Sequence, residues 1–222
     1  MDKISEWTVD NKMKLNENKS KLMIFNFTHN YQFSTRVHLN DSLLDIINKT
    51  TLLGTVVSSD LTWHSNTEYI VRRGYQRMCM LRNLYEFEIP KADLVMIYTM
   101  YIRSVLEYNS NVWFSSITNE EREDIERVQR VACKIILKED YRDYQQALEA
   151  LNLQSLSDRR QSLAKRFALK CANSDRFSNM FPLNQKQAET RNNEKYLVKF
   201  AKSGRLQKSS IPAMQKLLNR RK

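Results

Sequence analysis

Carboxylates are the first residues to consider for chemistry, because nucleases and polymerases hold two metal ions with clustered Asp and Glu. The eleven aspartates of this sequence never form an adjacent pair, and acidic density is highest in NEEREDIE, residues 119–126. The start of a capped helix explains this run better than a metal site does, since acids stabilise a helix N-terminus. We therefore expect no metal site there and assign no catalytic residue.

Other site chemistries are also poorly represented. The sequence has no nucleophile elbow, no glycine-rich phosphate loop and no histidine-based metal motif. Its cysteines, Cys79, Cys133 and Cys171, are odd in number and far apart, which fits neither a disulfide framework nor a zinc site. We interpret all three as buried, reduced thiols.

Positive charge is more informative because it is unevenly distributed. Residues 1–141 carry 18 Lys and Arg against 19 Asp and Glu, whereas residues 142–222 carry 18 against 6. A basic region of this kind suggests a polyanionic partner, with nucleic acid first and an anionic membrane surface second. A merely solvated basic surface is the alternative.

Two groups of basic residues occur on predicted helices, where they could contact phosphates without reading bases. The first group is Arg72, Arg73 and Arg77, and the second is Arg159, Arg160, Lys165 and Arg166. Arginines on an exposed helix face are often only solvated. We favour nucleic-acid contact for the second group and leave the first open.

Aromatic residues could supply stacking platforms for bases. The candidates share helical spacing with Leu and Val, which favours core packing instead; they are Tyr98, Tyr101, Tyr108 and Trp113.

The elements that position these residues change character near residue 60. A short helix over residues 4–14 precedes four β-rich runs, at 21–27, 36–39, 43–47 and 51–57. Asn40-Asp41 predicts a tight turn, and Gly54 predicts a bend or a close backbone approach within the last strand. Together they predict a small antiparallel sheet that must pack against something else.

Helical patterns extend from residue 62 to about 173. Capping boxes are predicted at Ser65 with Glu68 and at Thr118 with Glu121. Pro90 suits the first turn of a central helix, and a shorter helix is predicted near 144–151. We also expect exposed ion pairs between Glu123 and Arg127 and between Glu126 and Arg130.

A last helix of this region is predicted to start at Ser155 with Asp158, and its apolar positions are Leu156, Leu163, Phe167 and Cys171. After Pro182 the chain is polar and basic, so only partial order is expected. The predicted fold is α-dominated α+β: a small antiparallel sheet in residues 1–60, a helical bundle in 61–181 and a basic, partly ordered tail in 182–222.

The cellular context is expected to be intracellular, without a choice between nucleus and cytoplasm. No apolar run approaches the roughly 20 residues that span a bilayer, and the N-terminus lacks the apolar core of a secretory signal. We expect neither a membrane partner nor a small-molecule substrate.

Six segments in this order resemble the end of the reverse transcriptases of non-LTR (LINE-type, jockey-like) retrotransposons, which are RNA-directed DNA polymerases. They are MKLNENKSKLMIF, LLGTVVSSDLTWHSN, IPKADLVMIYTMYIRSVLEYNSNVWFSSIT, DIERVQRVACKIIL, YQQALEALNLQSLSDRRQSLAKRFALK and RNNEKYLVKFAKSGRLQKSSIPAMQKLLN. Each segment alone is weakly specific, but together they cover nearly the whole chain.

The resemblance implies a role for several positions. In the family, a polymerase palm with a Tyr-x-Asp-Asp motif precedes these segments and binds two magnesium ions. None of that palm is present, so we expect this sequence to begin part-way through a domain. Lys19, followed by Lys21, matches the motif lysine near the departing pyrophosphate, and the strand with Leu53 and Gly54 resembles the primer grip. The helices from residue 62 resemble the thumb and C-terminal segment, which hold the template–primer.

The expected function is therefore that of a fragment or remnant of such a polymerase, inactive alone and without a cofactor of its own, although the full-length family uses magnesium. Its expected partner is an RNA or DNA template–primer, with a palm-bearing chain as an additional candidate. Two alternatives stay open: a stand-alone nucleic-acid-binding module, and a helical protein-interaction scaffold.

Overall fold

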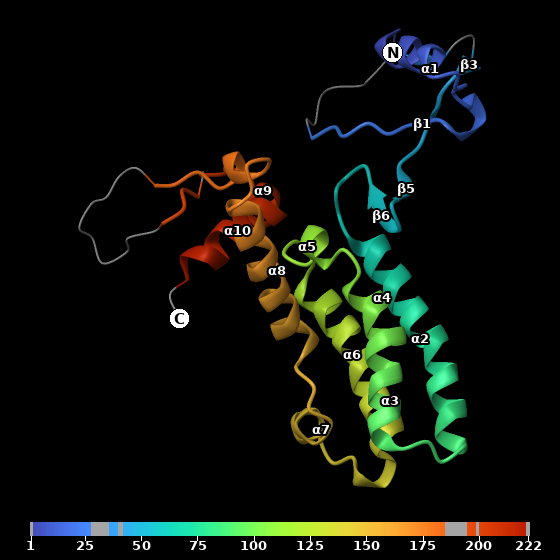
Figure 1. Cartoon of the computed structure of the whole chain (residues 1–222), viewed down its shortest axis with the longest axis vertical. Helices are drawn as coiled ribbons and strands as arrows, with labels where there is room; N and C mark the ends of the chain where they lie inside the picture. Colours follow the sequence, from blue (N-terminus) through green and yellow to red (C-terminus); the bar gives the residue numbers. More distant parts are fainter. Residues whose placement is uncertain (1, 28–35, 40–41, 185–194, 199, 221–222) are drawn as a thin grey trace. The chain divides into compact units, whose positions relative to one another are not determined.

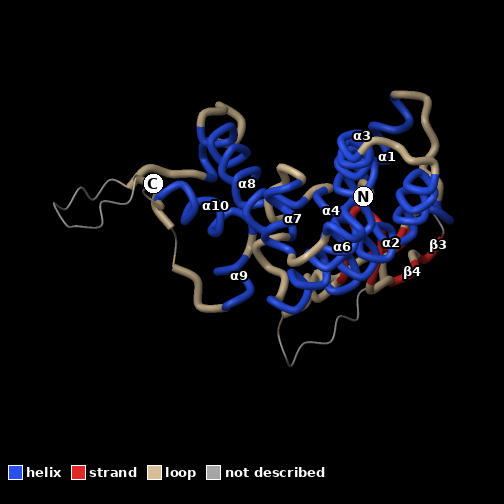
Figure 2. The backbone as a smooth tube through the Cα atoms, turned by 90° about the horizontal axis from the view of Figure 1, so that it is seen from below, coloured by secondary structure: helices blue, strands red, loops and turns tan. Residues whose placement is uncertain are grey.

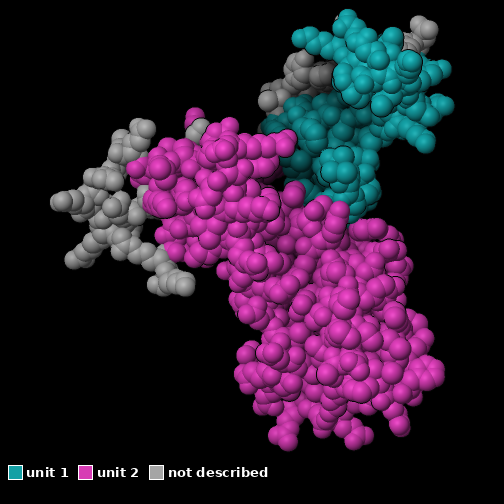
Figure 3. Space-filling model, in the orientation of Figure 1, with its two compact units in different colours: residues 1–65 teal, residues 66–222 magenta. Residues whose placement is uncertain are grey.

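The chain folds into two compact units, residues 1–65 and 66–222 (Figure 3). The computed structural model describes residues 2–27, 36–39, 42–184, 195–198 and 200–220. The named strands all lie between residues 21 and 58, and helices make up most of the remaining described chain (Figure 2). This is the α-dominated α+β fold that the hydrophobic periodicity predicts.

In its described residues, the first unit contains helix α1, a 3₁₀ turn and six short strands. Their bounds are α1 Asp2–Asp10, η1 Glu17–Lys19, β1 Lys21–Leu22, β2 His38–Leu39, β3 Ser42–Leu43, β4 Asp45–Ile46, β5 Lys49–Leu52 and β6 Thr55–Ser58. The strands form three two-stranded sheets: β1 with β4 in parallel, and β2 with β3 and β5 with β6 antiparallel. The turn predicted at residues 40–41 lies outside the described residues.

The prediction of one strand over residues 51–57 is wrong. The segment is a β-hairpin in which Leu52 pairs with Thr55, and Leu53 and Gly54 form its two-residue turn. Both turn residues have positive φ, 48° and 80°. Hairpins favour such turns because their twist matches that of the paired strands, and glycine adopts the conformation without strain.

The second unit is built from helices (Figure 1). Their bounds are α2 His64–Glu86, which starts at the end of the first unit, α3 Lys91–Ile97, the π-helix η2 Tyr98–Arg103, α4 Ser104–Glu107, α5 Ser110–Trp113, α6 Asn119–Leu137, η3 Lys138–Asp140, α7 Tyr144–Ala150, α8 Leu156–Ala172, η4 Ser178–Met180, α9 Gly204–Lys208 and α10 Ser210–Asn219. The helices α2, α4 and α6 meet at Gly74, where an added Cβ would lie 3.0 Å from side-chain atoms of Leu106 and Val128. The absence of a side chain at Gly74 thus allows close packing.

Helix starts follow the local capping rules in two of three predicted cases. Thr118 and Glu121 form the predicted capping box of α6, with hydrogen bonds of 3.1 and 2.7 Å. Ser155 caps α8 by accepting the Asp158 amide at 3.1 Å. Ser65 does not cap α2, because this helix already begins at His64; the Ser65 hydroxyl instead accepts a hydrogen bond from Lys49 at 3.2 Å.

Part of the predicted tail belongs to the core of the second unit. Ala168 and Cys171 of α8 form one buried cluster with Phe181, Tyr196 and Met214. The rings of Phe181 and Tyr196 meet edge to face, with centroids 6.4 Å apart. These apolar residues pack α10 against α8. They are hard to recognise in the sequence because most residues after Pro182 are polar or basic.

Candidate nucleic-acid interface

The predicted residues of the first unit lie on its surface. Lys19 is exposed at the end of η1, while Lys21 pairs with Asp45, its neighbour across the β1–β4 pair, at 2.6 Å. The hydrogen bond and charge of Lys21 lower the pKa of Asp45. Leu53 is 83% exposed at the hairpin turn, next to Gly54.

The arginines of α2 separate into two kinds. Arg72 and Arg73 are exposed. Arg77 donates a hydrogen bond to the Tyr101 carbonyl oxygen, and its guanidinium lies 4.4 Å from the centre of the Tyr101 ring. Arg77 therefore joins α2 to the π-helix η2 and is committed to packing.

The group on α8 divides in the same way. The Nε of Arg159 donates to Glu107 at 2.9 Å. Arg160 is only 1% exposed and lies near two rings, 5.6 Å from the centre of Trp113 and 5.1 Å from that of Phe114. Among the described residues its Nε and Nη2 find no hydrogen-bond partner, and burial lowers its pKa to about 10. A nucleic-acid strand therefore cannot contact Arg160 in this conformation.

The composition of the buried face of α8 explains why the sequence pattern wrongly predicts an exposed Arg160. This face is formed by Leu156, Arg160, Ala164, Ala168 and Cys171. The predicted face was chosen from the larger apolar residues, but Phe167 is exposed and Leu163 half-buried. Lys165 is half-buried and Arg166 is exposed. A stripe of small residues at helical spacing is the signal that could have placed Arg160 inside.

Glu126 does not form the exposed ion pair with Arg130 that its spacing predicts. Arg130 pairs with Glu123 at 2.7 Å, and Arg127 pairs with Asp124 at 3.0 Å, which replaces the expected pair of Glu123 with Arg127. Glu126 is buried, accepts the Leu156 amide at 3.0 Å and also accepts the Tyr144 hydroxyl. Its carboxylate thereby stabilises the N-terminus of α8.

Gln129 extends this buried network on α6. Its Oε1 accepts the Tyr98 hydroxyl at 2.6 Å, while its Nε2 donates to the Tyr144 hydroxyl at 2.8 Å and to the Gln154 carbonyl at 3.0 Å. Burial raises the pKa values of Tyr98 and Tyr144. These polar groups satisfy one another, which indicates a structural role.

Aromatic side chains also divide between core and surface. Tyr98 and Trp113 are fully buried, as core packing predicts, whereas Tyr101 and Tyr108 are exposed. Cys133 and Cys171 are buried, as predicted. The prediction is wrong for Cys79, which is exposed.

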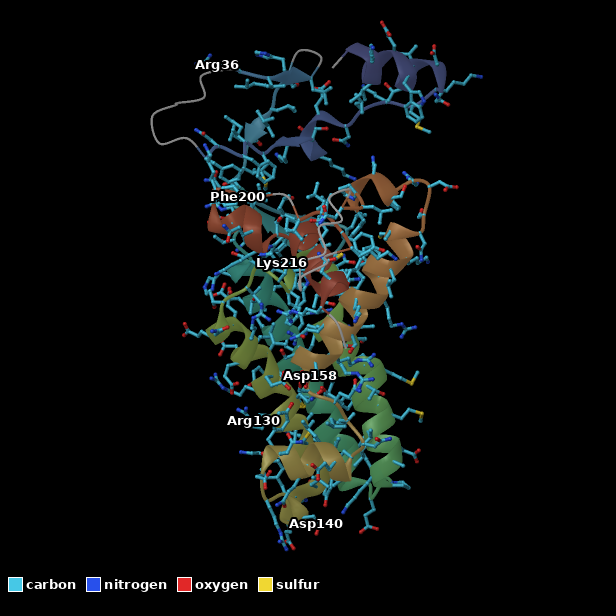
Figure 4. All side chains as sticks on the ribbon, turned by 90° about the vertical axis from the view of Figure 1, so that its left-hand side faces the viewer. Arg36, Arg130, Asp140, Asp158, Phe200 and Lys216 are labelled. Carbon is cyan, nitrogen blue, oxygen red and sulfur yellow. The ribbon has the colours of Figure 1, made fainter. Side chains whose placement is uncertain are left out.

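The largest accumulation of exposed positive charge comes after Arg160. Within the described residues 159–184, 195–198 and 200–220 the sequence has twelve Lys and Arg, and Asp175 is the single acid. We call ten of them the C-terminal cations: Lys165, Arg166, Lys170, Arg176, Lys195, Lys202, Arg205, Lys208, Lys216 and Arg220. All except the half-buried Lys165 are exposed. Figure 4 labels one of them, Lys216 on α10, and the acid Asp158 at the first turn of α8.

Six of these cations lie on α8, α9 and α10, which pack together. The helices α8 and α10 share the buried cluster of Ala168, Cys171 and Met214. The Ser116 hydroxyl donates to the Lys208 carbonyl at 2.8 Å, which fastens α9 as well. Cations that are distant in sequence thus lie on helices that pack together.

Over the described ranges, no group of three or more His, Cys, Asp or Glu side chains could hold a metal ion. In the same ranges, no helix has both the length and the apolar character required to cross a bilayer.

Comparisons of the chain with protein-family models, with curated proteins and with solved structures find no match.

Proposed function

We propose that residues 66–222 bind nucleic acid through its sugar–phosphate backbone, in the manner expected of the thumb and C-terminal segment of a non-LTR reverse transcriptase, and that this chain alone does not polymerise. One observation carries the proposal: the packed helices α8, α9 and α10 hold six of the C-terminal cations and a single acid, Asp158. A surface of this composition attracts a polyanion and repels other cations.

The charge pattern favours backbone contact over base reading. Lys and Arg side chains that neutralise phosphates release counterions, so affinity falls steeply as salt rises. If about half of the C-terminal cations contact duplex phosphates, the slope of log K against log salt would be about −4 to −5. Arg72 and Arg73 are exposed and free to add to this contact, whereas Arg77 and Arg160 serve packing.

The proposal is tested by fluorescence anisotropy with a labelled RNA–DNA hybrid over a salt series. The test variant is Arg166→Gln with Lys170→Gln, both exposed on α8. Neutralising two phosphate contacts should weaken binding about tenfold and make the slope shallower by about 2.

A matched control has the same loss of charge elsewhere. Lys91→Gln with Arg127→Gln removes two cations that pair with Asp140 and Asp124. This variant should bind almost as the wild type does. Equal weakening by both variants, or an affinity that does not change with salt concentration, would overturn the proposal and favour the scaffold alternative.

Point substitutions are preferable to truncation after Pro182. Removing α10 would also remove Met214 from the buried cluster. A truncated chain that failed to bind could then simply have lost its fold.

A further inference from the structure

A pocket of about 280 Å³ lies between α5, α8, α9 and α10, within the second unit. Four cations line it: Arg122, Lys208, Lys216 and Arg220. No Asp or Glu belongs to its lining, which consists of described residues. Four like charges around one hollow repel one another, so an anion placed among them would relieve that repulsion.

The walls of the pocket are held by contacts between segments far apart in sequence. The Ser210 hydroxyl donates to the Val112 carbonyl at 2.6 Å, and the Ser116 hydroxyl donates to the Lys208 carbonyl at 2.8 Å. Met214, which lines the pocket, is also part of the buried cluster with α8. The pocket is therefore formed before any ligand arrives, which lowers the entropic cost of binding.

Arg122 is the most constrained of the four cations. Its Nη2 donates to the Phe114 carbonyl at 2.9 Å, and its guanidinium lies 4.4 Å from the centre of the Phe114 ring. Burial lowers its pKa, although the charge of Glu121 opposes this effect. The Glu121 carboxylate accepts the Thr118 amide in the α6 capping box. A partly desolvated guanidinium held in one orientation gains strongly from an anionic acceptor.

Two polar atoms in the pocket lining point to the same kind of ligand. Ser115 Oγ and Asn111 Oδ1 are buried, and no described residue forms a hydrogen bond with either. Buried polar atoms normally have a partner. Because both atoms are covered in this conformation, a ligand with donors and acceptors would reach them only after the two side chains rotate.

Part of the pocket lining is apolar. Ala164, Met214 and Leu217 line it beside the cations. The volume lies near the lower end of the roughly 300–1,000 Å³ typical of small-molecule sites, and it exceeds the need of a single phosphate. The fitting ligand therefore combines an anionic group with a flat apolar one.

We infer that this pocket binds a nucleoside phosphate, with the phosphate among Arg122, Lys208, Lys216 and Arg220 and the base against Met214 and Leu217. The same groups are offered by a free nucleotide and by the terminal nucleotide of a strand. The second source rests on the proposed function, because a strand must first be held by the C-terminal cations.

The inference is tested on the full chain by calorimetric titration with adenosine 5′-monophosphate, with adenosine and inorganic phosphate as partial ligands. The variant Lys208→Gln with Lys216→Gln should weaken the monophosphate about tenfold. Lys91→Gln with Arg127→Gln has the same net charge and lies outside both the pocket lining and the C-terminal cations, so it should leave this affinity unchanged. Circular dichroism confirms that both variants fold.

The possible sources are separated by competition between oligonucleotides of about 10 nucleotides with a 5′-phosphate or a 5′-hydroxyl. Preference for the phosphorylated end, lost with Lys208→Gln and Lys216→Gln, assigns the pocket to a strand terminus; no preference assigns it to a free nucleotide. Equal weakening of the monophosphate by both double variants, or adenosine binding as tightly, or no binding of the monophosphate, overturns the inference. Failure of the hybrid to bind while the monophosphate still binds overturns the proposed function alone.

Discussion

Arg160 and Arg166 lie on the same helix, yet their surroundings differ completely. Arg160 is buried near Trp113 and Phe114, whereas Arg166 is exposed. Arg160→Ala should lower the free energy of unfolding by about 2–4 kcal/mol, since it removes buried packing against two rings. The slope of binding against salt should stay unchanged. Urea unfolding and anisotropy measure the two effects.

Arg166→Ala is the counterpart of this prediction. It should leave stability within about 0.5 kcal/mol and make the salt slope shallower by about 1. If Arg160→Ala instead altered the salt slope without destabilising the chain, the burial of this guanidinium would not describe the protein in solution.

Cys133 predicts how stability changes in alkali. Burial raises the pKa of its thiol from the ordinary value of 9.0 to about 12. Above pH 9 the unfolded thiol loses its proton while the folded one retains it, so the folded state becomes less stable as pH rises. Between about pH 8 and about pH 10 this thiol should remove about 1.4 kcal/mol of stability.

Cys133→Ala isolates this contribution. Burial is the largest cause of the raised pKa values of Tyr98 and Tyr144 and is the same in both proteins, so most of their contribution cancels in the comparison. Urea unfolding at the two pH values should therefore show a smaller loss for the variant. Identical losses would mean that Cys133 titrates alike in the folded and unfolded chain.

At the scale of elements, the meeting of α2, α4 and α6 depends on Gly74. An added Cβ would lie 3.0 Å from side-chain atoms of Leu106 and Val128, which must shift to admit it. Gly74→Ala should cost about 1–2 kcal/mol, because overpacking outweighs the better helix propensity of alanine. Thermal unfolding followed by far-ultraviolet circular dichroism measures the change.

Gly204 offers a matched control for this substitution. A Cβ added at this position would have no atom of the described residues within 4 Å, apart from its two chain neighbours and the backbone of its own helix. Gly204→Ala should therefore change stability by less than about 0.5 kcal/mol. Equal effects of the two substitutions would show that backbone entropy, and not packing at Gly74, determines the outcome.

The elements that sequence predicts best are those with local signals. Thr118 and Ser155 mark helix starts because their partners lie three residues away. The β5–β6 hairpin escapes prediction because leucine rarely adopts the positive φ seen at Leu53. Pairing between strands depends on contacts that no local pattern shows.

The candidate site was predictable only in part, for a related reason. Charge counting locates the basic region, since composition needs no geometry. It cannot tell that Arg160 is buried, or that Arg122 of α6 lines the same pocket as Lys216 of α10. Those facts follow from tertiary packing of separated segments.

At the scale of the whole molecule, the two units differ in the size of their cores. Among described residues, the buried apolar side chains of the first unit are Leu39, Leu44 and Val56, and those of the second are far more numerous. Small cores give little stability. We expect the first unit to unfold at a lower denaturant concentration than the second.

Tryptophans provide the measurement. Trp113 is fully buried in the second unit, and Trp7 and Trp63 belong to the first. With Trp7→Phe and Trp63→Phe, fluorescence reports the second unit alone, while far-ultraviolet circular dichroism reports both. The fluorescence transition should come later than the first change in dichroism, whereas coincident transitions would show one cooperative unit.

Polymerase activity is the second test at this scale. The sequence lacks an Asp-Asp motif, and no metal-binding cluster occurs in the described part of the chain. Under the proposal that this chain alone does not polymerise, primer extension with magnesium should give no product above background, whereas a complete reverse transcriptase extends the same template. Synthesis that co-purifies with this chain would contradict the proposal.

The exposure of Cys79, set against the burial of Cys133 and Cys171, has a practical consequence. Maleimide reagents reach accessible thiols first, so the unmodified chain accepts a spectroscopic label on α2 without prior mutagenesis. A second spin label at an introduced Leu53→Cys would allow the distance between the two labels to be measured. Double electron–electron resonance could then follow the distance between the labelled units as an RNA–DNA hybrid is added.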